Sequence, residues 1–479
     1  MDIRREGESN LDWFNRYVMN EIPIRLIRLS DMKFVGRIDV MKHFQSHVSE
    51  DFNDPSKLVK YAILSHRWLD GGEPTYKRMK SFRALARGPG YRKLKKFCEK
   101  ARAYGVEFAW SDTCCIDKSS STELDESIRS MFRWYRNSYV CIIHLAQSET
   151  IQDIASDGWM KRGWTLQELL APYRIKLFNK KWIPMTGDEN DKNSEDTEVM
   201  KTLAEATGIH PNYLREFDPG PIKVNERMSW AAERKTTRVE DVAYSLMGIF
   251  DVSLQIAYGE GADRAFCRLI EAIMRAGDPS VLNWVGEPAR HHSSSAIPQS
   301  PKCFVGRKLE LPQSLGWRLD MTMTSLGLRV PLVIFPLRIR STVSWGPADE
   351  YEQRHQVILE CQLCPTITID YFDVVPPHYA RHWQFALGIV NHSIGSCEVP
   401  RVRGKSIGFI LHRGPEVSVA ICEPRPNDFV GLQPVSPSNS EFDPWKKVNR
   451  TGLVEVNFPG IHSDSFIYVD RERLQFVYL

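Results

Sequence analysis

The fold of this chain is decided by the stretch Tyr61–Trp68, which reads YAILSHRW. Its first part, Tyr61–Ser65, is an apolar run with the length and composition typical of a buried strand. The strand runs directly into Ser65–Trp68, four side chains that can hydrogen-bond, carry charge or stack. A buried strand that ends in such residues predicts a binding or reaction site at its carboxyl end.

Strand-like and helix-like patterns alternate on both sides of this stretch. Apolar residues recur at helical spacing over Leu94–Ala101 and Leu124–Tyr135, and a short helix is expected at Trp164–Leu170. The predicted strands are Ile24–Leu29, Tyr61–Ser65, Val106–Trp110, Tyr139–Leu145 and Arg174–Phe178. Strands separated by helices of this length indicate an α/β fold with a mainly parallel sheet and right-handed crossovers.

The second half of the chain changes in character twice. The acidic stretch Gly187–Thr197 is expected to be a solvated loop, and helical patterns resume over Glu198–Arg275. After Gly286, short alternating runs punctuated by Pro and Gly predict a small all-β sandwich or barrel. The expected domains are residues 1–186 as the α/β domain, 187–290 as its helical extension, 291–300 as a linker and 301–479 as a β-rich C-terminal domain.

Length and composition restrict the class of protein. The chain of 479 residues exceeds what one core usually supports, so two or three domains are expected. Its net charge of +3 does not nominate nucleic acid as a partner. No run approaches the roughly 20 apolar residues of a membrane span, and the charged N-terminus lacks a signal-peptide core. The ten cysteines are scattered, which suits a reducing compartment, so a cytoplasmic location is expected.

Three short motifs resemble binding sites but lack a required residue. Arg403–Ser406 resembles the end of a phosphate-binding loop, yet Val399 stands where the loop needs Gly. The pair at Cys361–Cys364 has zinc-ligand spacing without a second Cys or His pair at the required distance. The pair His291–His292 lies in the expected linker. Neither a metal site nor a bound cofactor is expected.

Three segments are more informative together than apart. They are Ser65–Trp68, Trp110–Lys118 and Arg162–Leu169. The first two follow strands, and ligands of parallel sheets bind outside the carboxyl ends of the strands. A short helix crossing that edge would bring Trp164 and Glu168 to one face, because i and i+4 are neighbours on a helix. The alternative is a purely structural role, in which Trp68, Trp110 and Trp164 are core aromatics and Asp112 is a helix cap or a turn residue.

These segments resemble the fungal heterokaryon (vegetative) incompatibility domain, the HET domain. The resemblance rests on Tyr61–Trp68, Asp112–Lys118 (DTCCIDK) and Arg162–Pro172 (RGWTLQELLAP), and continues through Arg227–Ala232 (RMSWAA), Thr237–Tyr244 (TRVEDVAY) and Tyr258–Gly261 (YGEG). It covers roughly residues 23–285. One departure is Ser111, where the family more often has an apolar residue. The resemblance implies a role in allorecognition or immune-like programmed cell death, usually through self-association of the domain.

A more distant resemblance, to Toll/interleukin-receptor (TIR) domains, bears on mechanism. A strand ending near Ser65, an acidic turn near Asp117, the helix Glu123–Asn137 and the Trp-x-x-x-Glu-Leu element at Trp164–Leu169 follow the TIR order. In TIR-type NAD glycohydrolases the glutamate of that element is the catalytic carboxylate, which implies this role for Glu168. NAD is then the substrate rather than a cofactor.

Residue type and position at this edge of the sheet predict a set of substrate-binding residues around Glu168. They are Ser65, Arg67, Trp68, Asp112, Cys115, Asp117 and Trp164. By residue type, Trp68 or Trp164 would stack on a base or on nicotinamide. Arg67 would meet the pyrophosphate.

Three alternatives stay open at this point. One is a non-catalytic signalling module that assembles with itself, with an upstream sensor or with an incompatibility partner. Another is thiol catalysis at Cys114 or Cys115, with His66 or His144 as the base. The third, a nuclease or other hydrolase, has no metal-ligand cluster in the sequence to support it.

Overall fold

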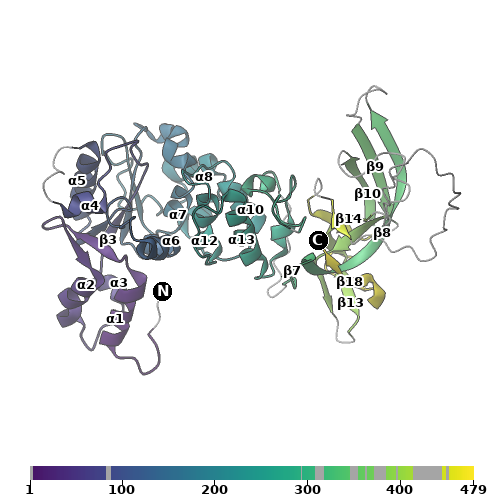
Figure 1. Cartoon of the computed structure of the whole chain (residues 1–479), viewed down its shortest axis with the longest axis horizontal. Helices are drawn as coiled ribbons and strands as arrows, with labels where there is room; N and C mark the ends of the chain where they lie inside the picture. The colour runs from purple at the N-terminus through teal and green to yellow at the C-terminus, as the bar shows by residue number, and fades with distance from the viewer. Residues whose placement is uncertain are drawn as a thin grey trace, which may run out of the picture. The chain divides into compact units, whose positions relative to one another are not determined.

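The computed structural model describes most of the chain, in two compact units. The described residues are 4–81, 88–292, 294–307, 318–345, 354–361, 364–371, 384–394, 398–413, 445–448 and 452–479. Unit 1 comprises Met1–Ile222 with Ser229–Ala272, and unit 2 comprises Lys223–Met228 with Ile273–Leu479. Unit 1 is built of strands and helices, whereas unit 2 consists mainly of strands beyond residue 320 (Figure 1).

Unit 1 is organised around a six-stranded sheet of order β2-β1-β4-β3-β5-β6. Its strands are β1 (Arg25–Arg28), β2 (Lys33–Gly36), β3 (Tyr61–His66), β4 (Phe108–Trp110), β5 (Val140–His144) and β6 (Ile175–Phe178). The last four run parallel to one another, while β1 and β2 add an antiparallel edge beside β4. The expected α/β class is therefore confirmed, with a mixed rather than wholly parallel sheet. A TIR-like fold stays a prediction.

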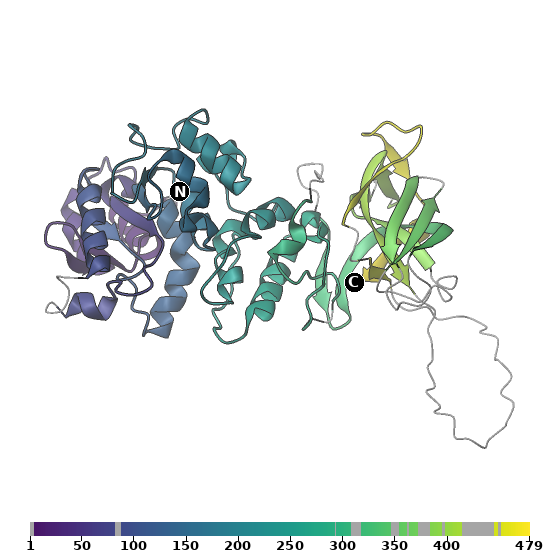
Figure 2. The ribbon, with the colours of Figure 1, turned by 90° about the horizontal axis from the view of Figure 1, so that it is seen from above.

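Helices and short turns of helix connect these strands, and further helices follow β6 along the chain (Figures 1 and 2). The helices of this unit are α1 (Asn10–Glu21), α2 (Arg37–Phe44), α3 (Pro55–Leu58), α4 (Tyr76–Lys80), α5 (Pro89–Arg102), α6 (Ser121–Arg136), α7 (Thr165–Leu170), α8 (Glu198–Thr207), α9 (Pro211–Arg215), α11 (Asp241–Tyr244) and α12 (Met247–Phe250). The residues of α10 (Val224–Ala231) and α13 (Ala262–Met274) are divided between the two units. The 3-10 turns of this unit are η1 (Gln45–His47), η2 (Ile151–Ser156) and η3 (Gly158–Lys161). The apolar stripe predicted on α5 is buried as expected.

The polar segment after β6 is a loop that is mostly exposed, as its composition predicted, except at two charged residues. Asp191 and Lys192 are 2% and 1% exposed. Asp191 accepts hydrogen bonds from the Lys176 ammonium at 3.0 Å and the Leu177 amide at 2.7 Å, so it anchors the segment to β6. The charge pattern misled because each buried charge has its own set of partners, which composition does not reveal.

Unit 2 is built from antiparallel strands, as the alternating sequence predicted. The nine-stranded sheet runs β10-β9-β8-β11-β14-β15, with β16 paired to β14 and β7 and β18 paired to β8; a second sheet has order β12-β13-β17. Strand bounds are β7 (Thr322–Thr324), β8 (Gly327–Trp345), β9 (Arg354–Cys361), β10 (Cys364–Tyr371), β11 (Gln384–Ile389), β12 (His392–Ile394), β13 (Pro400–Arg403), β14 (Lys405–Arg413), β15 (Lys446–Lys447), β16 (Val454–Asn457), β17 (Phe466–Tyr468) and β18 (Leu474–Tyr478).

The core of unit 2 is formed by alternate residues of its long strands. Val333, Phe335 and Leu337 of β8 pack with Leu387 and Ile389 of β11, because side chains two apart on a strand share one face. The 3-10 turns η4 (Pro279–Leu282), η5 (Pro301–Phe304) and η7 (Arg471–Arg473) complete the unit.

Part of the segment that was expected to be a linker, residues 291–300, is buried. Ser294, Ala296 and Ile297 of this segment are buried in unit 2. The exact domain boundaries stay predictions. In the part of the chain that the structure describes, every helix is too short or too polar to cross a bilayer.

Candidate functional site

The topology of the sheet in unit 1 predicts a ligand-binding crevice beside the end of β3. Among the parallel strands, β3 comes first in the chain yet lies between β4 and β5, so the connections leaving β3 and β4 run in opposite directions along the sheet. In open α/β sheets, ligands bind outside the carboxyl ends of the strands at such a reversal. Strand β3 ends at His66 and β5 ends at His144, in register with each other. The candidate site is therefore expected beyond Ser65 and His66.

Ser65, Trp159 and Glu168 form a buried hydrogen-bonded cluster at this edge. The Ser65 hydroxyl donates to Glu168 Oε2 at 2.5 Å and accepts from the Trp159 indole N–H at 2.8 Å. Ser65 and Trp159 are fully buried, and Glu168 is 6% exposed. Three segments that are far apart in the sequence thus meet around one carboxyl group.

The environment of Glu168 favours its neutral form. Burial raises the pKa of Glu168 to about 8, with a further contribution from the nearby negative charge of Asp112. The hydrogen bond from Ser65 and the positive charge of Arg162 act in the opposite direction but are outweighed. A carboxyl group with this pKa is mostly protonated at neutral pH and can change charge when its surroundings change.

The segment before α7 is held tightly, which fixes where Glu168 points. Thr165 donates to the Trp159 carbonyl at 2.6 Å, and the Arg234 guanidinium donates to the Arg162 carbonyl at 2.9 Å. Gly163 has no room for a side chain, because a Cβ there would lie 2.5 Å from a methyl group of Thr236. This close approach explains why glycine stands between Arg162 and Trp164.

The opposite end of α7 is held by a buried lysine. The Lys192 ammonium donates to the carbonyls of Leu169 at 2.6 Å and Pro172 at 2.8 Å. Burial lowers the pKa of Lys192 to about 7. A cation is favourable at a helix C-terminus, where carbonyl groups lack helical partners. Lys192 therefore positions the helix that carries Glu168.

A second polar cluster surrounds Asp112 at the same edge of the sheet. Asp112 Oδ1 lies 3.2 Å from His66 Nε2, and Oδ2 accepts from the Trp68 indole N–H at 2.7 Å. Burial acts to raise the pKa of Asp112, but the hydrogen bond from His66 and the charges of Lys118 and Arg162 outweigh it and hold the pKa below its usual range. Asp112 is therefore ionised at neutral pH.

Cations gather around the exposed face of Trp68. The Lys118 ammonium lies 3.7 Å from the centroid of the Trp68 ring and the Arg162 guanidinium 5.4 Å from it. Trp68 is 37% exposed. The Trp68 indole is thus held by the Asp112 carboxylate and by cation–π contacts, and two positive charges lie around its ring.

Arg67 points along the edge toward the segment after β5. Its guanidinium lies close to Gly158, where an added Cβ would meet it at 3.0 Å. Its carbonyl accepts from the buried Lys93 ammonium at 3.2 Å, and Lys93 also forms an ion pair with Glu73. The Arg67 side chain is exposed, so it is accessible to an anion.

Three other residues of the predicted site lie apart from the Ser65–Glu168 contact. Cys115 is 2% exposed, and its sulfur accepts from the Ser111 amide at 3.5 Å. The Asp117 carboxylate accepts from the Ser119 hydroxyl at 2.6 Å. The Trp164 indole donates to Asp241 at 2.9 Å. Their substrate-binding roles stay predictions. None of their described side-chain contacts reaches Glu168, although the Glu168 amide donates to the Trp164 carbonyl at 3.4 Å.

The C-terminal motifs of unit 1 form the support behind Trp164. Asp241 also accepts from the Tyr258 hydroxyl at 2.9 Å. Glu240 accepts from the amides of Gly259 and Gly261 at 2.9 and 3.2 Å. The Thr237–Tyr244 and Tyr258–Gly261 motifs therefore join each other and Trp164, which gives them a structural role.

The alternatives based on thiols and metals find little support in the geometry. Cys114 is fully buried, and a hydrogen bond with Cys115 together with burial raises its pKa, which disfavours the reactive thiolate. His144 stacks on Trp182, with the ring centroids 4.2 Å apart. Among the described residues, no group of three or more His, Cys, Asp or Glu could hold a metal ion. The Cys361–Cys364 side chains lie outside the described residues.

Sequence reasoning missed Trp159, Lys192 and Arg234. Trp159 lies three residues before the Arg-Gly-Trp motif, so its position in the sequence could have indicated that it packs near Glu168. Lys192 lies in an acidic stretch and Arg234 in a helical one, where charged residues are usually solvated. Nothing in the sequence distinguished these two from surface residues.

Comparisons with known proteins match the chain in part. Residues 61–152 match the family model described as Heterokaryon incompatibility protein (HET). The vegetative incompatibility protein HET-E-1 of Podospora anserina is 43% identical over 230 residues, which are 45% of this chain and 16% of that protein. No solved structure matches the chain. The matched family segment contains Ser65, Trp68 and Asp112, whereas Trp159 and Glu168 lie beyond it.

Proposed function

This chain is a HET-domain protein, and from that premise we propose that it acts in incompatibility-type cell death by cleaving NAD, with Glu168 as the catalytic carboxyl group. The HET-E-1 relative is a vegetative incompatibility protein by name, which supports the biological role. The distant TIR resemblance supports the reaction. The chain spans 16% of that relative's length, so the activity of the whole relative is not carried over.

One observation carries the enzymatic proposal. Glu168 is a nearly buried carboxyl group, bonded to Ser65 at the carboxyl end of the first parallel strand, with a pKa raised to about 8. Titratable groups shifted this far by burial and a specific neighbour cluster at functional sites. The location is also where this sheet topology places ligands.

The chemistry required of the site is hydrolysis of the nicotinamide–ribose bond. The carbon–nitrogen bond breaks, its electron pair leaves with neutral nicotinamide, and water adds to the ribose carbon with release of a proton. The ribose carbon becomes oxocarbenium-like, and an ionised carboxylate stabilises that positive charge. Glu168 would lose its proton as the cationic nicotinamide ring of NAD approaches, because an opposite charge lowers a carboxyl pKa.

Other residues of the crevice would bind the rest of the dinucleotide. Arg67, which is exposed, and the Lys118 and Arg162 side chains around Trp68 present positive charge suited to a pyrophosphate. Trp68 offers an aromatic surface for stacking. Asp112 remains ionised and holds Trp68 in place.

A second function, a non-catalytic assembly module, is favoured by one specific observation. Ser65 and Trp159 are fully buried and Glu168 is 6% exposed, so the cluster is closed to a large substrate in this conformation. Under this alternative the cluster stabilises the domain, and self-association or a partner transmits the signal. Under the enzymatic proposal, assembly opens the segment that contains Trp159.

The two functions differ in one experiment. Purified protein is incubated with NAD over a concentration series that spans monomer to assembly, with assembly followed by sedimentation, and released nicotinamide is measured. Glu168→Gln is expected to lose turnover by at least about a hundredfold while it still folds and assembles. Glu260→Gln is the matched control, because Glu260 is bonded to Tyr244 and Arg268 away from the crevice. If assembled wild-type protein releases no nicotinamide, the enzymatic proposal is rejected and the non-catalytic assembly module is supported.

A further inference from the structure

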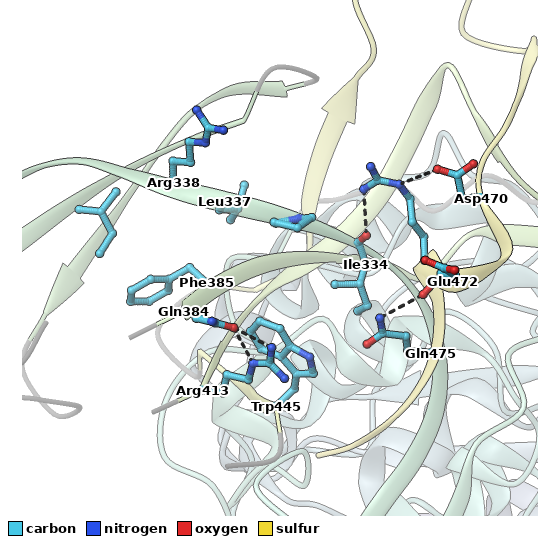
Figure 3. Close-up of a pocket in the computed structure, with 13 residues that line it drawn as sticks. Ile334, Leu337, Arg338, Gln384, Phe385, Arg413, Trp445, Asp470, Glu472 and Gln475 are labelled. Atoms are coloured by element: carbon cyan, nitrogen blue, oxygen red, sulfur yellow. Dashed lines mark hydrogen bonds and ion pairs between the residues drawn. The ribbon is translucent and has the colours of Figure 1, made fainter. Parts of the chain in front are cut away.

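An open hollow of about 840 Å³ is lined by residues of β8 and β11 in unit 2 (Figure 3). Two of its arginines already donate to acceptors of the protein. The Arg413 guanidinium donates to Gln384 Oε1 at 2.9 and 2.6 Å, and the Arg473 guanidinium donates to the Ile334 carbonyl at 3.5 Å. The buried donors around Lys447, elsewhere in unit 2, differ from these because acceptors for several of them are absent from the described residues.

Lys447 is a buried cation with more donors than acceptors. It is 1% exposed, and its ammonium donates to the Trp284 carbonyl at 3.2 Å and lies 3.9 Å from the centroid of the Trp284 ring. An ammonium has three N–H donors. The carbonyl uses one and the ring face accepts at most one more, so at least one is left without an acceptor among the described residues. The equally buried Lys192 has carbonyl acceptors at 2.6, 2.8 and 3.5 Å, so burial alone does not produce this deficit.

Two further donors of this region are buried without an acceptor among the described residues. They are Arg307 Nε and Asn283 Nδ2, and Asn283 is 1% exposed. A Cβ added at Gly452 would lie 3.1 Å from Asn283 Oδ1 and 3.3 Å from Arg307 Nη1, so these two side chains converge on one place. Asn283 directly precedes Trp284, whose carbonyl and ring Lys447 contacts. Lys447, Arg307 and Asn283 therefore form one cluster of buried donors, and unsatisfied buried donors are unfavourable.

The charge of this cluster is positive. Burial lowers the pKa of Lys447 to about 7, and the nearby positive charge of Arg307 acts in the same direction, against a smaller opposite contribution from the Cys303 thiol. Among the residues that the structure describes, no carboxylate forms an ion pair with Lys447 or Arg307. A negative group beside the ammonium would favour its charged form, because an opposite charge stabilises an ionised group.

We propose that this cluster is a binding site for a small oxyanion of the size of phosphate, held by the Lys447 ammonium, the Arg307 guanidinium and the Asn283 amide. Such an anion has several acceptor oxygens, so it satisfies donors of three side chains at once and balances their charge. The burial of Lys447 and Asn283 restricts the ligand to a small ion. The site belongs to unit 2 and does not depend on NAD cleavage in unit 1, and a bound anion would join β15 to the segment that contains Asn283 and thereby stabilise unit 2.

The test titrates inorganic phosphate into the full-length chain at pH 7 by isothermal titration calorimetry, with sodium chloride keeping the ionic strength constant. Saturable binding of one phosphate per chain is expected. Lys447→Met should weaken phosphate at least about tenfold, because the charge is lost while most of the side-chain volume stays. Arg307→Gln should weaken it about tenfold as well. Asn283→Asp should have at least as large an effect, because it replaces a donor by a negative charge.

The matched control is Lys446→Met. Lys446 precedes Lys447 on β15 and carries the same charge, but it is exposed. Phosphate affinity should stay within about twofold of wild type in this variant, and circular dichroism confirms folding of each variant. If Lys447→Met does not fold, Arg307→Gln and Asn283→Asp decide the test. Absence of saturable binding by the wild type, an equal loss in Lys446→Met, or unchanged affinity in the folded variants of the cluster would each overturn the proposal.

Discussion

Glu168 and Asp112 lie at the same edge of one sheet, yet their environments drive their ionisation in opposite directions. Burial and the charge of Asp112 raise the pKa of Glu168 to about 8. For Asp112, the hydrogen bond from His66 and the charges of Lys118 and Arg162 overcome burial and lower the pKa. The Ser65 hydroxyl that donates to Glu168 is neutral, and a neutral donor stabilises a carboxylate less than a cation does.

The difference separates two roles within the crevice. A carboxyl group that is ionised throughout holds donors and attracts cations, whereas one with a pKa near neutrality can exchange its proton during a reaction. Asp112 is thus suited to fixing Trp68 and His66, and Glu168 to the chemical step. Four substitutions, from the largest expected effect to the smallest, test this division.

Replacing Glu168 should remove the largest single contribution to the pH dependence of folding stability. Because its folded pKa of about 8 lies above the ordinary 4.5, the folded state keeps a proton that the unfolded state releases. The contribution of Glu168 to the free energy of unfolding is therefore fully present below about pH 4.5. It is lost as pH rises toward 8, by on the order of 4 kcal/mol. Glu168→Gln should lack this decline, measured by urea unfolding at pH 5 and pH 8.5. Parallel pH curves for wild type and variant would show that Glu168 is not shifted.

Replacing Asp112 should give the opposite pH dependence. Its lowered pKa contributes stability above the ordinary value of 3.8, which is lost as pH falls toward the folded value. Asp112→Asn should cost about 2 kcal/mol at pH 6 and much less at pH 2.5. Asp117→Asn is the control, since that carboxylate bonds only to nearby Ser119 among its described contacts, and a change within about 0.5 kcal/mol is expected. A cost independent of pH would contradict the assignment.

Removing the indole donor of the buried cluster should have an intermediate effect. Trp159→Phe keeps a ring but deletes the N–H that bonds Ser65, at a cost of about 1–2 kcal/mol beyond the change in ring size. Trp134→Phe controls for ring size, because the equally buried Trp134 N–H has no acceptor among the described residues. Urea unfolding of both variants measures the difference. Equal losses would mean that the Ser65 bond contributes nothing.

Replacing Lys192 should act locally on α7. Lys192→Met leaves the Leu169 and Pro172 carbonyls without their donor while it preserves most of the volume. Exchange of the Ala171 amide, which bonds to the Gln167 carbonyl, should accelerate about tenfold, and amides of α6 should not change. Acceleration spread over both helices would indicate general destabilisation instead of positioning.

The sequence predicted the parts of this molecule that depend on periodicity. The strands ending near Ser65, Trp110 and Leu145 and the helix stripe on α5 follow from apolar spacing, and the parallel arrangement follows from strand–helix alternation. The contact between Ser65 and Glu168 joins residues 103 positions apart, and it was expected only as two residues at one edge.

The parts that could not be predicted depend on buried polar partners. Lys192 and Asp191 look like solvated residues until β6 and α7 are in place to satisfy them. The sequence predicted that Trp164 and Glu168 lie on one face of a helix and both line the site. In the structure the Trp164 indole donates to Asp241. Such choices depend on which long-range partner is nearest, and spacing along a single sequence does not specify that.

The most direct test of the central claim is the pH dependence of nicotinamide release by the assembled protein. The value of kcat/KM for NAD reports ionisation of the free protein, so it should rise with pH and level off above the Glu168 pKa of about 8. Glu168→Gln should abolish the rise together with the activity. A flat profile, or a Glu168→Gln variant as active as wild type, would contradict the assignment of Glu168 as the catalytic carboxyl group.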